Sequence, residues 1–107
     1  MPAPGITVED LKARRDRGES LALVDVREPH EWEISDLPGS VKIPLGTLPQ
    51  KLAELPKDAE IVVYCRTGGR SDQAVQFLRQ KGYSKAVNLT GGINRWAEVI
   101  DPSLPRY

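Results

Sequence analysis

The feature of this sequence that most constrains its fold is a repeated alternation of short apolar runs with helical patterns. Residues 21–26 and 60–64 form nearly continuous apolar runs, and such runs are typical of strands covered on both faces. Residues 41–43 and 86–89 are two shorter candidate strands. Because strands that alternate with helices form parallel sheets through right-handed crossovers, the sequence predicts an α/β fold with helices on both faces of a mainly parallel sheet.

Start and stop signals place the helices between these strands. Thr7 begins a Thr-x-x-acid start signal, and Gly18 follows the same helix as a stop. Pro29 fits the first turn of a later helix. The Pro- and Gly-containing start and the Pro-containing end of the chain are expected to be loose or docked on the surface. The expected helices span residues 7–17, 29–34, 48–55, 71–81 and 93–100.

Length and composition limit the classes of protein to which the chain can belong. Its 107 residues, 39% of them hydrophobic, suit one domain, so residues 1–107 are expected to form a single unit. Lys plus Arg and Asp plus Glu number 15 each, which provides no global field for nucleic acid or an anionic membrane. One cysteine and one histidine exclude an internal disulfide and a four-ligand zinc site, and no cofactor is expected. No apolar run resembles a signal peptide or a membrane span, so a soluble, cytoplasmic protein is expected.

Chemistry is most plausible in the segment after the second long apolar run, because ligands of parallel sheets bind beyond the carboxyl ends of strands. This segment, Cys65 to Arg70 and here named the Cys65 loop, contains two arginines and two consecutive glycines. Gly68 and Gly69 permit backbone conformations with positive φ, which would turn successive N–H groups inward to bind an anion. Arg66, Arg70 and the start of the next helix add positive charge. A cysteine in that field is expected to have a lowered pKa and to be a thiolate, the nucleophilic form.

The cysteine, Arg66 and the two glycines of the Cys65 loop also have simpler interpretations when each is taken alone. A lone cysteine at the end of a strand is often a small buried hydrophobic residue. Arg66 alone fits a solvated side chain, and Gly68-Gly69 alone fits an ordinary tight turn. The combination favours chemistry, because apolar neighbours would suppress ionisation of the thiol, whereas arginines and glycines are what an anion site needs.

Four stretches of the sequence together resemble the rhodanese homology family. The resemblance extends from about Gly5 to Tyr107. It implies a five-stranded parallel sheet flanked by helices, with Cys65 as the sulfur-carrying nucleophile. The matching stretches are residues 24–29 (VDVREP), 37–44 (LPGSVKIP), 61–71 (IVVYCRTGGRS) and Gly91-Gly92 followed by Trp96.

The same resemblance implies a sulfurtransferase reaction in two steps. The Cys65 thiolate takes the sulfane sulfur of thiosulfate or of a persulfide donor and becomes a persulfide. The sulfur then passes to a small thiol, cyanide or a ubiquitin-like sulfur carrier. The side chains of Arg66 and Arg70 are expected to attract the donor. The backbone N–H groups expected to hold the persulfide are those of Arg66, Thr67, Gly68, Gly69 and Arg70.

Two other functions stay open at this point. A noncatalytic rhodanese-like module would present the loop to a protein partner, although the intact cysteine and both arginines argue against it. A cysteine phosphatase or arsenate reductase is disfavoured, because four residues separate Cys65 from Arg70 where related phosphatases have five. Residues 100–107 resemble the closing segment of rhodanese modules fused behind adenylating enzymes, and a strap over the surface is the alternative interpretation of this tail.

Other polar and aromatic residues receive structural interpretations. Asp25 and Arg27 follow a buried strand and could border the Cys65 loop. A structural role is favoured for both, since a carboxylate beside the thiolate would raise the pKa of the cysteine. His30 lies in a polar stretch, is expected to be exposed and is assigned no catalytic role. Trp32 and Trp96 are expected to be packing residues, with Trp96 a candidate wall for the mouth of the loop.

Overall fold

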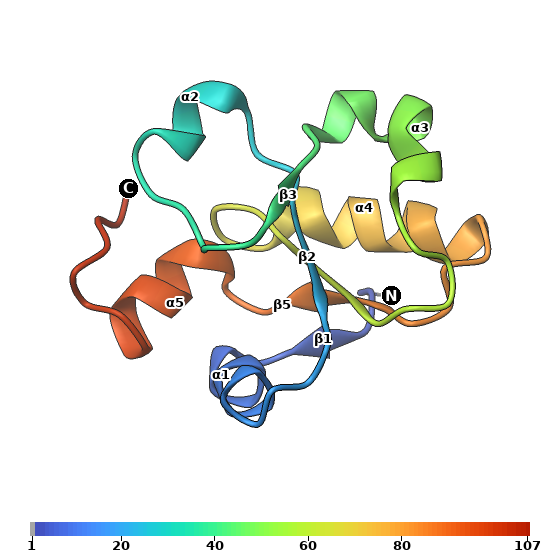
Figure 1. Cartoon of the computed structure of the whole chain (residues 1–107). Helices are drawn as coiled ribbons and strands as arrows, with labels where there is room; N and C mark the ends of the chain where they lie inside the picture. The colour runs from blue at the N-terminus through green and yellow to red at the C-terminus, as the bar shows by residue number, and fades with distance from the viewer. Residues whose placement is uncertain (1) are drawn as a thin grey trace.

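A computed structural model describes residues 2–107 and has a parallel sheet at its centre. The strand order is β1-β5-β4-β2-β3, and every neighbouring pair is parallel (Figure 1). Because β4 lies between β5 and β2, the residue that follows it leaves the sheet at the middle of the carboxyl edge. The five strands are β1 (Gly5–Ile6), β2 (Ala22–Asp25), β3 (Val41–Lys42), β4 (Ile61–Tyr64) and β5 (Ala86–Leu89).

Helices connect the strands and cover both faces of the sheet (Figure 1). The first of them is capped as its sequence predicts, because the Thr7 hydroxyl accepts a hydrogen bond from the N–H of Asp10 at 3.0 Å. The helices are α1 (Val8–Asp16), α2 (Pro29–Trp32), α3 (Leu48–Lys51), α4 (Gly69–Gln80) and α5 (Gly92–Val99), with the short 3-10 helices η1 (Leu45–Thr47) and η2 (Leu52–Glu54) on either side of α3.

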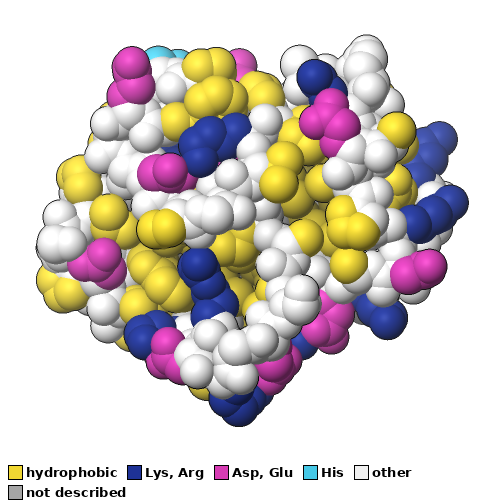
Figure 2. All heavy atoms as spheres, viewed as in Figure 1, with side chains coloured by type: hydrophobic (Ala, Val, Ile, Leu, Met, Phe, Trp, Pro, Cys, Tyr) yellow, Lys and Arg dark blue, Asp and Glu magenta, His cyan; other side chains and the backbone are white. Residues whose placement is uncertain are grey.

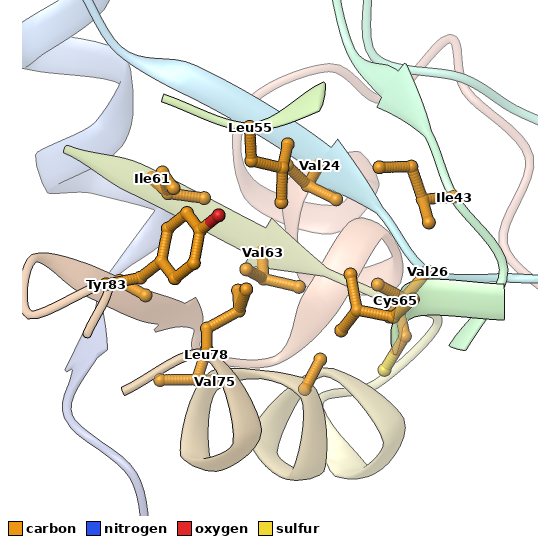
Figure 3. Close-up of a cluster of buried hydrophobic side chains, with 13 residues drawn as sticks. Val24, Val26, Ile43, Leu55, Ile61, Val63, Cys65, Val75, Leu78 and Tyr83 are labelled. Atoms are coloured by element: carbon orange, nitrogen blue, oxygen red, sulfur yellow. The ribbon is translucent and has the colours of Figure 1, made fainter. Parts of the chain in front are cut away.

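Two apolar clusters, one on each face, hold the layers together. Leu78 of α4 and Leu48 of α3 belong to the cluster on one face, which Figure 3 shows together with Cys65 at its edge. Leu11 of α1 and Ile93 of α5 belong to the cluster on the other face. Buried apolar side chains of this kind are the main source of the fold's stability.

The alternation of side chains along β4 decides which face Cys65 meets. Ile61 and Val63 lie in the cluster under α3 and α4, whereas Val62 and Tyr64 lie in the cluster under α1 and α5. Successive residues of a strand point to opposite faces. Cys65, the next residue, therefore points to the same side as Val63, toward α4.

The predicted fold class is confirmed, with two corrections in detail. The apolar patterns located four of the five strands but predicted none at Gly5 and Ile6, which form β1 and pair with β5. Two residues are too few to show a strand period. Helix α4 begins at Gly69 and not at the predicted Ser71, so the end of the Cys65 loop is its first turn.

The surface carries charges of both signs. On the face shown in Figure 2, basic and acidic side chains are interspersed over the surface, in keeping with the equal totals of 15 for the whole chain. Across residues 2–107, no helix combines the length and the apolar character needed to cross a membrane.

Candidate active site

Cys65 follows the central strand and faces the start of helix α4. Figure 3 shows its sulfur over the N-terminal end of that helix, beside Val26. The backbone between strand and helix turns at Gly68, whose φ of 119° lies in the left-handed region that favours glycine. The turn folds the Cys65 loop back over its own first residue.

Three hydrogen bonds from the loop and helix reach the Cys65 sulfur. The N–H of Gly68 donates at 3.1 Å, the N–H of Ser71 at 3.5 Å and the Ser71 hydroxyl oxygen lies at 3.3 Å. The N–H of Ser71 is free to do so, because the first turn of a helix has no intrahelical acceptors. These donors and the positive end of the helix surround the sulfur with groups that favour an anion.

The electrostatic result is a more acidic thiol. Burial raises the pKa of the Cys65 thiol, whereas the Ser71 hydroxyl and the backbone N–H groups of the loop lower it, and the net pKa lies below the ordinary value of 9.0. A lowered pKa means a larger thiolate fraction at neutral pH, and the thiolate is the nucleophilic form of cysteine.

For the persulfide, the ring of amides predicted over residues 66–70 stays a prediction, and around the thiol itself the structure shows part of such a ring. Gly68 takes the expected positive φ, but Gly69 is the first helical residue and does not. Ser71, which lies outside the predicted loop, donates its backbone N–H to the sulfur and places its hydroxyl oxygen within hydrogen-bond distance of it. The reason is the early start of α4, which brings the N–H of its third residue to the sulfur.

Asn88 of β5 ties the loop to the helix. Its Oδ1 accepts from the Ser71 hydroxyl at 2.5 Å, and its Nδ2 donates to the carbonyl of Gly68 at 3.1 Å. One amide side chain thus holds both residues that donate to the Cys65 sulfur. Asn88 carries no local sequence signal of this role, because only the parallel pairing of β4 with β5 brings it beside the loop.

The start of helix α5 supports the first two residues of the loop. The N–H of Ile93 donates to the carbonyl of Cys65 at 3.0 Å, and the N–H of Asn94 donates to that of Arg66 at 3.1 Å. Gly92 allows this approach, since a Cβ at this position would lie 2.4 Å from the Arg66 oxygen. The Gly91-Gly92 turn, with φ of 85° and 63°, therefore fixes the backbone that carries the cysteine.

Arg70 forms a two-pronged ion pair with a carboxylate from helix α2. Its guanidinium donates to Glu31 at 2.6 and 2.8 Å, and Glu31 is buried, with 6% of its surface exposed. The Arg70 hydrogen bonds lower the pKa of Glu31 to about 2, against the opposing effect of burial. Arg70 is thus held in one place, and its charge is partly offset by Glu31.

Asp25 and Arg27 form a buried pair behind this site, which agrees with the structural role predicted for them. The two side chains are fully buried and joined at 2.8 Å. Arg27 also donates to the carbonyls of Glu31 and Ser35 at 3.2 and 2.7 Å. The pair therefore anchors the segment from which Glu31 reaches Arg70.

The remaining aromatic and imidazole residues behave largely as predicted. His30 is exposed. Trp96 is 8% exposed and packs in the cluster under α1 and α5. It lines a hollow with Lys12 and Pro38 and is not part of the hollow beside the Cys65 loop. Trp32 is half-buried.

Cys65 is more deeply buried than the sequence suggests. Only 1% of the residue is exposed, and its side chain belongs to the apolar cluster under α3 and α4. A hollow of about 490 Å³ borders the loop, and its lining includes Thr67, Gly68, Asn88 and Gly91. Cys65 itself does not line this hollow, so a reagent reaches the sulfur only when groups around the thiol move aside.

Comparison with known proteins places this architecture in a family. The sequence model of the rhodanese-like domain family matches residues 7–99 of the chain. The chain is 41% identical, over 86% of its own length and 86% of the relative, to a sulfurtransferase of Allochromatium vinosum. It is also 41% identical over 95% of its length to the probable adenylyltransferase/sulfurtransferase MoeZ of Mycobacterium tuberculosis, of which it spans 26%.

A solved structure agrees with these sequence matches. The rhodanese-related protein of Thermoplasma volcanium superposes with a TM-score of 0.82 at 33% identity, over 95% of each chain. The resemblance inferred from the motifs is thereby confirmed for both fold and family. The chain therefore belongs to the rhodanese-like domain family, with a buried cysteine after its central strand.

Proposed function

We propose that Cys65 carries sulfur as a persulfide between an external donor and an external acceptor. The observation that supports this most directly is the set of hydrogen bonds from Gly68 and Ser71 to the Cys65 sulfur. The same donors that favour a thiolate also suit the persulfide anion that replaces it. A cysteine kept only as a packing residue has no need of three polar contacts on its sulfur.

The first step is attack on the donor. The Cys65 thiolate forms a bond to the outer sulfur of thiosulfate, the sulfur–sulfur bond of thiosulfate breaks, and sulfite leaves with the electron pair of that bond. The enzyme is left as the Cys65 persulfide anion. Since a preformed thiolate attacks, the step needs no general base, in agreement with the exposed position of His30.

The second step returns the enzyme to its starting form. A small thiol, as its thiolate, or cyanide attacks the outer sulfur of the persulfide, and the sulfur–sulfur bond breaks with its electron pair going to Cys65. The acceptor leaves as a persulfide or as thiocyanate. This chain has one cysteine, so the acceptor is a separate molecule, and a ubiquitin-like sulfur carrier is one candidate. The similarity to MoeZ supports that candidate.

The Cys65 loop divides the remaining work between backbone and side chains. Arg66 and Arg70 attract an anionic donor, and Glu31 holds Arg70 in place for this. Thr67, Gly68 and Gly69 form the backbone over the sulfur, and the short loop leaves less room for a phosphoryl group than the longer loop of phosphatases. This favours sulfur transfer over phosphate ester hydrolysis.

The deep burial of Cys65 favours a second candidate, a noncatalytic module that binds a protein partner. Turnover separates the two. With thiosulfate and cyanide, the purified chain should release thiocyanate and sulfite continuously, whereas Cys65→Ser should release neither. A phenolic phosphate under the same conditions should stay intact. If the wild-type chain turns over no more sulfur than Cys65→Ser while it keeps its fold, the noncatalytic module is the correct assignment.

A further inference from the structure

The C-terminal segment docks onto the Cys65 loop although it is far from it in the sequence. In Figure 1 the chain beyond α5 turns back toward α2. The N–H of Tyr107 donates to Oδ1 of Asn94 at 3.2 Å. Asn94 is itself bound to the loop, because its own N–H donates to the carbonyl of Arg66 at 3.1 Å. Tyr107 is therefore fixed against the base of the loop.

The hydroxyl group of Tyr107 joins the two ion pairs beside the site, Asp25–Arg27 and Glu31–Arg70. It accepts a hydrogen bond from Arg27 at 2.9 Å and donates to Oε1 of Glu31 at 2.8 Å. The same Oε1 accepts from Arg70 at 2.8 Å. The hydroxyl thus fixes the carboxylate that in turn fixes Arg70.

The ring of Tyr107 contacts the other arginine of the loop. The guanidinium carbon of Arg66 lies 4.9 Å from the ring centroid, within the range of a cation–π contact. Among the residues that the structure describes, Arg66 forms no ion pair, whereas Arg70 is paired with Glu31 and Arg27 with Asp25. Arg66 is therefore the arginine of the loop whose charge no carboxylate offsets.

From these contacts we propose that Tyr107 is a positioning residue for anionic sulfur donors. Its ring holds Arg66 and its hydroxyl holds Glu31 and, through it, Arg70, so that both guanidinium groups stay where an anion bound at the Cys65 loop meets them. The proposal rests on the proposed function and assigns a role to the tail. Tyr107 acts on the binding of the donor and not on the acidity of Cys65, which it does not touch.

Steady-state kinetics with thiosulfate as donor and cyanide as acceptor test this role. Tyr107→Leu removes ring and hydroxyl and should raise KM for thiosulfate about threefold to tenfold, with kcat changed less than about twofold. Tyr107→Phe keeps the ring over Arg66 and should show a smaller rise. Tyr83→Phe is the matched control, because its hydroxyl bonds to the carbonyl of Leu52, away from the loop. It should leave KM unchanged.

Two readouts separate positioning from a general loss of structure. The alkylation rate of Cys65 by iodoacetamide, which is uncharged, should be the same in Tyr107→Leu as in the wild type. In an Arg66→Ala background, Tyr107→Leu should raise KM much less, because part of its effect passes through Arg66. An unchanged KM in Tyr107→Leu overturns the proposal, and so does an equal fall in alkylation and turnover. If Tyr107→Leu does not fold, the comparison of KM for thiosulfate between Tyr107→Phe and Tyr83→Phe decides, since only Tyr107→Phe should raise it.

A separate measurement keeps the proposal distinct from the proposed function. Sulfite is the probe, because its protection of Cys65 against iodoacetamide requires anion binding but no sulfur transfer. The sulfite concentration for half protection should rise about threefold to tenfold in Tyr107→Leu. If the wild type fails to turn over thiosulfate but shows this shift, the function fails and the positioning role stands. If sulfite protects Cys65 equally in the wild type and in Tyr107→Leu, the positioning role of Tyr107 is overturned, whether or not the wild type turns over thiosulfate.

Discussion

The hydroxyl oxygen of Ser71 lies 3.3 Å from the sulfur of Cys65, in the first turn of helix α4. The hydroxyl has a single hydrogen and a second acceptor, Oδ1 of Asn88 at 2.5 Å, so it donates either to Asn88 or to the sulfur. A neutral hydroxyl near a thiolate stabilises the charged form, and this contact is the largest of those that lower the pKa of Cys65 against the effect of burial.

Ser71→Ala should therefore raise the pKa of Cys65. With the hydroxyl removed, the thiolate fraction at neutral pH falls, and alkylation by iodoacetamide at pH 7 should slow by up to about tenfold, the value of one hydrogen bond to a charged group. The pH profile of the alkylation rate measures the shift, and its midpoint should move to higher pH. Ser103→Ala, at an exposed serine, should leave the profile unchanged. A wild-type midpoint in Ser71→Ala would contradict this assignment.

The Glu31–Arg70 pair should make stability depend on acid pH. The pKa of Glu31 falls from an ordinary 4.5 to about 2 in the fold. A lowered folded pKa contributes stability that is present above the ordinary pKa and is lost as the pH falls toward 2. Glu31→Gln should therefore cost about 2 kcal/mol at pH 7, and the difference from wild type should shrink between pH 5 and pH 2.

Urea unfolding at several pH values measures this difference. Glu33→Gln, at an exposed carboxylate next to the same helix, is the matched control and should show no comparable loss. Glu31→Gln should also raise KM for thiosulfate, because Arg70 loses the partner that holds it. A stability difference that stays constant from pH 7 to pH 2 would show that the ion pair is not its source.

Gly92 should tolerate no side chain. An added Cβ would lie 2.4 Å from the Arg66 carbonyl oxygen, and the φ of 63° disfavours other residues. Gly92→Ala should destabilise the fold by about 2–5 kcal/mol and should lower turnover at temperatures where the variant is still folded. Gly46→Ala, where nothing lies within 4 Å of the added atom, should be close to neutral. Thermal unfolding of both variants tests the contrast.

Burial of Cys65 should make its reactivity depend on the size of the reagent. Because the residue is 1% exposed, a small reagent such as iodoacetamide should enter more readily than the bulky disulfide 5,5′-dithiobis(2-nitrobenzoate). The bulky reagent should react with Cys65 of the native protein at least about tenfold more slowly than with Cys65 of the protein unfolded in urea, where local opening is no longer required. Equal rates of the bulky reagent in native and unfolded protein would show an open thiol.

The sheet and the position of the cysteine could be predicted from the sequence because their signals are local. The apolar runs at β2 and β4 and the turn signals around them suffice for the alternation of strands and helices. Gly5 and Ile6 form too short a strand to show a period. The pattern predicts the start of α4 two residues late, because Gly69 and Arg70 fit a loop as well as a first helical turn.

Most partners of the site could not be predicted, because tertiary folding brings them together. Glu31 lies 39 residues from Arg70 in the sequence, and Tyr107 lies 76 residues from Glu31. Neither residue carries a local signal that distinguishes it from the other Glu or Tyr residues of the chain. Asp25 and Arg27 are the exception, since two opposite charges so close together after a buried strand already indicate a pair.

The central claim is that the Cys65 sulfur takes up one sulfur atom, and intact-mass measurement tests it most directly. After incubation of the reduced chain with thiosulfate and without an acceptor, the mass should increase by one sulfur atom, with one sulfite released per chain and the increase removed by a thiol reductant. Ser103→Ala should behave like the wild type, and Cys65→Ser should gain nothing. An unchanged wild-type mass, or an equal gain in Cys65→Ser, would contradict the account.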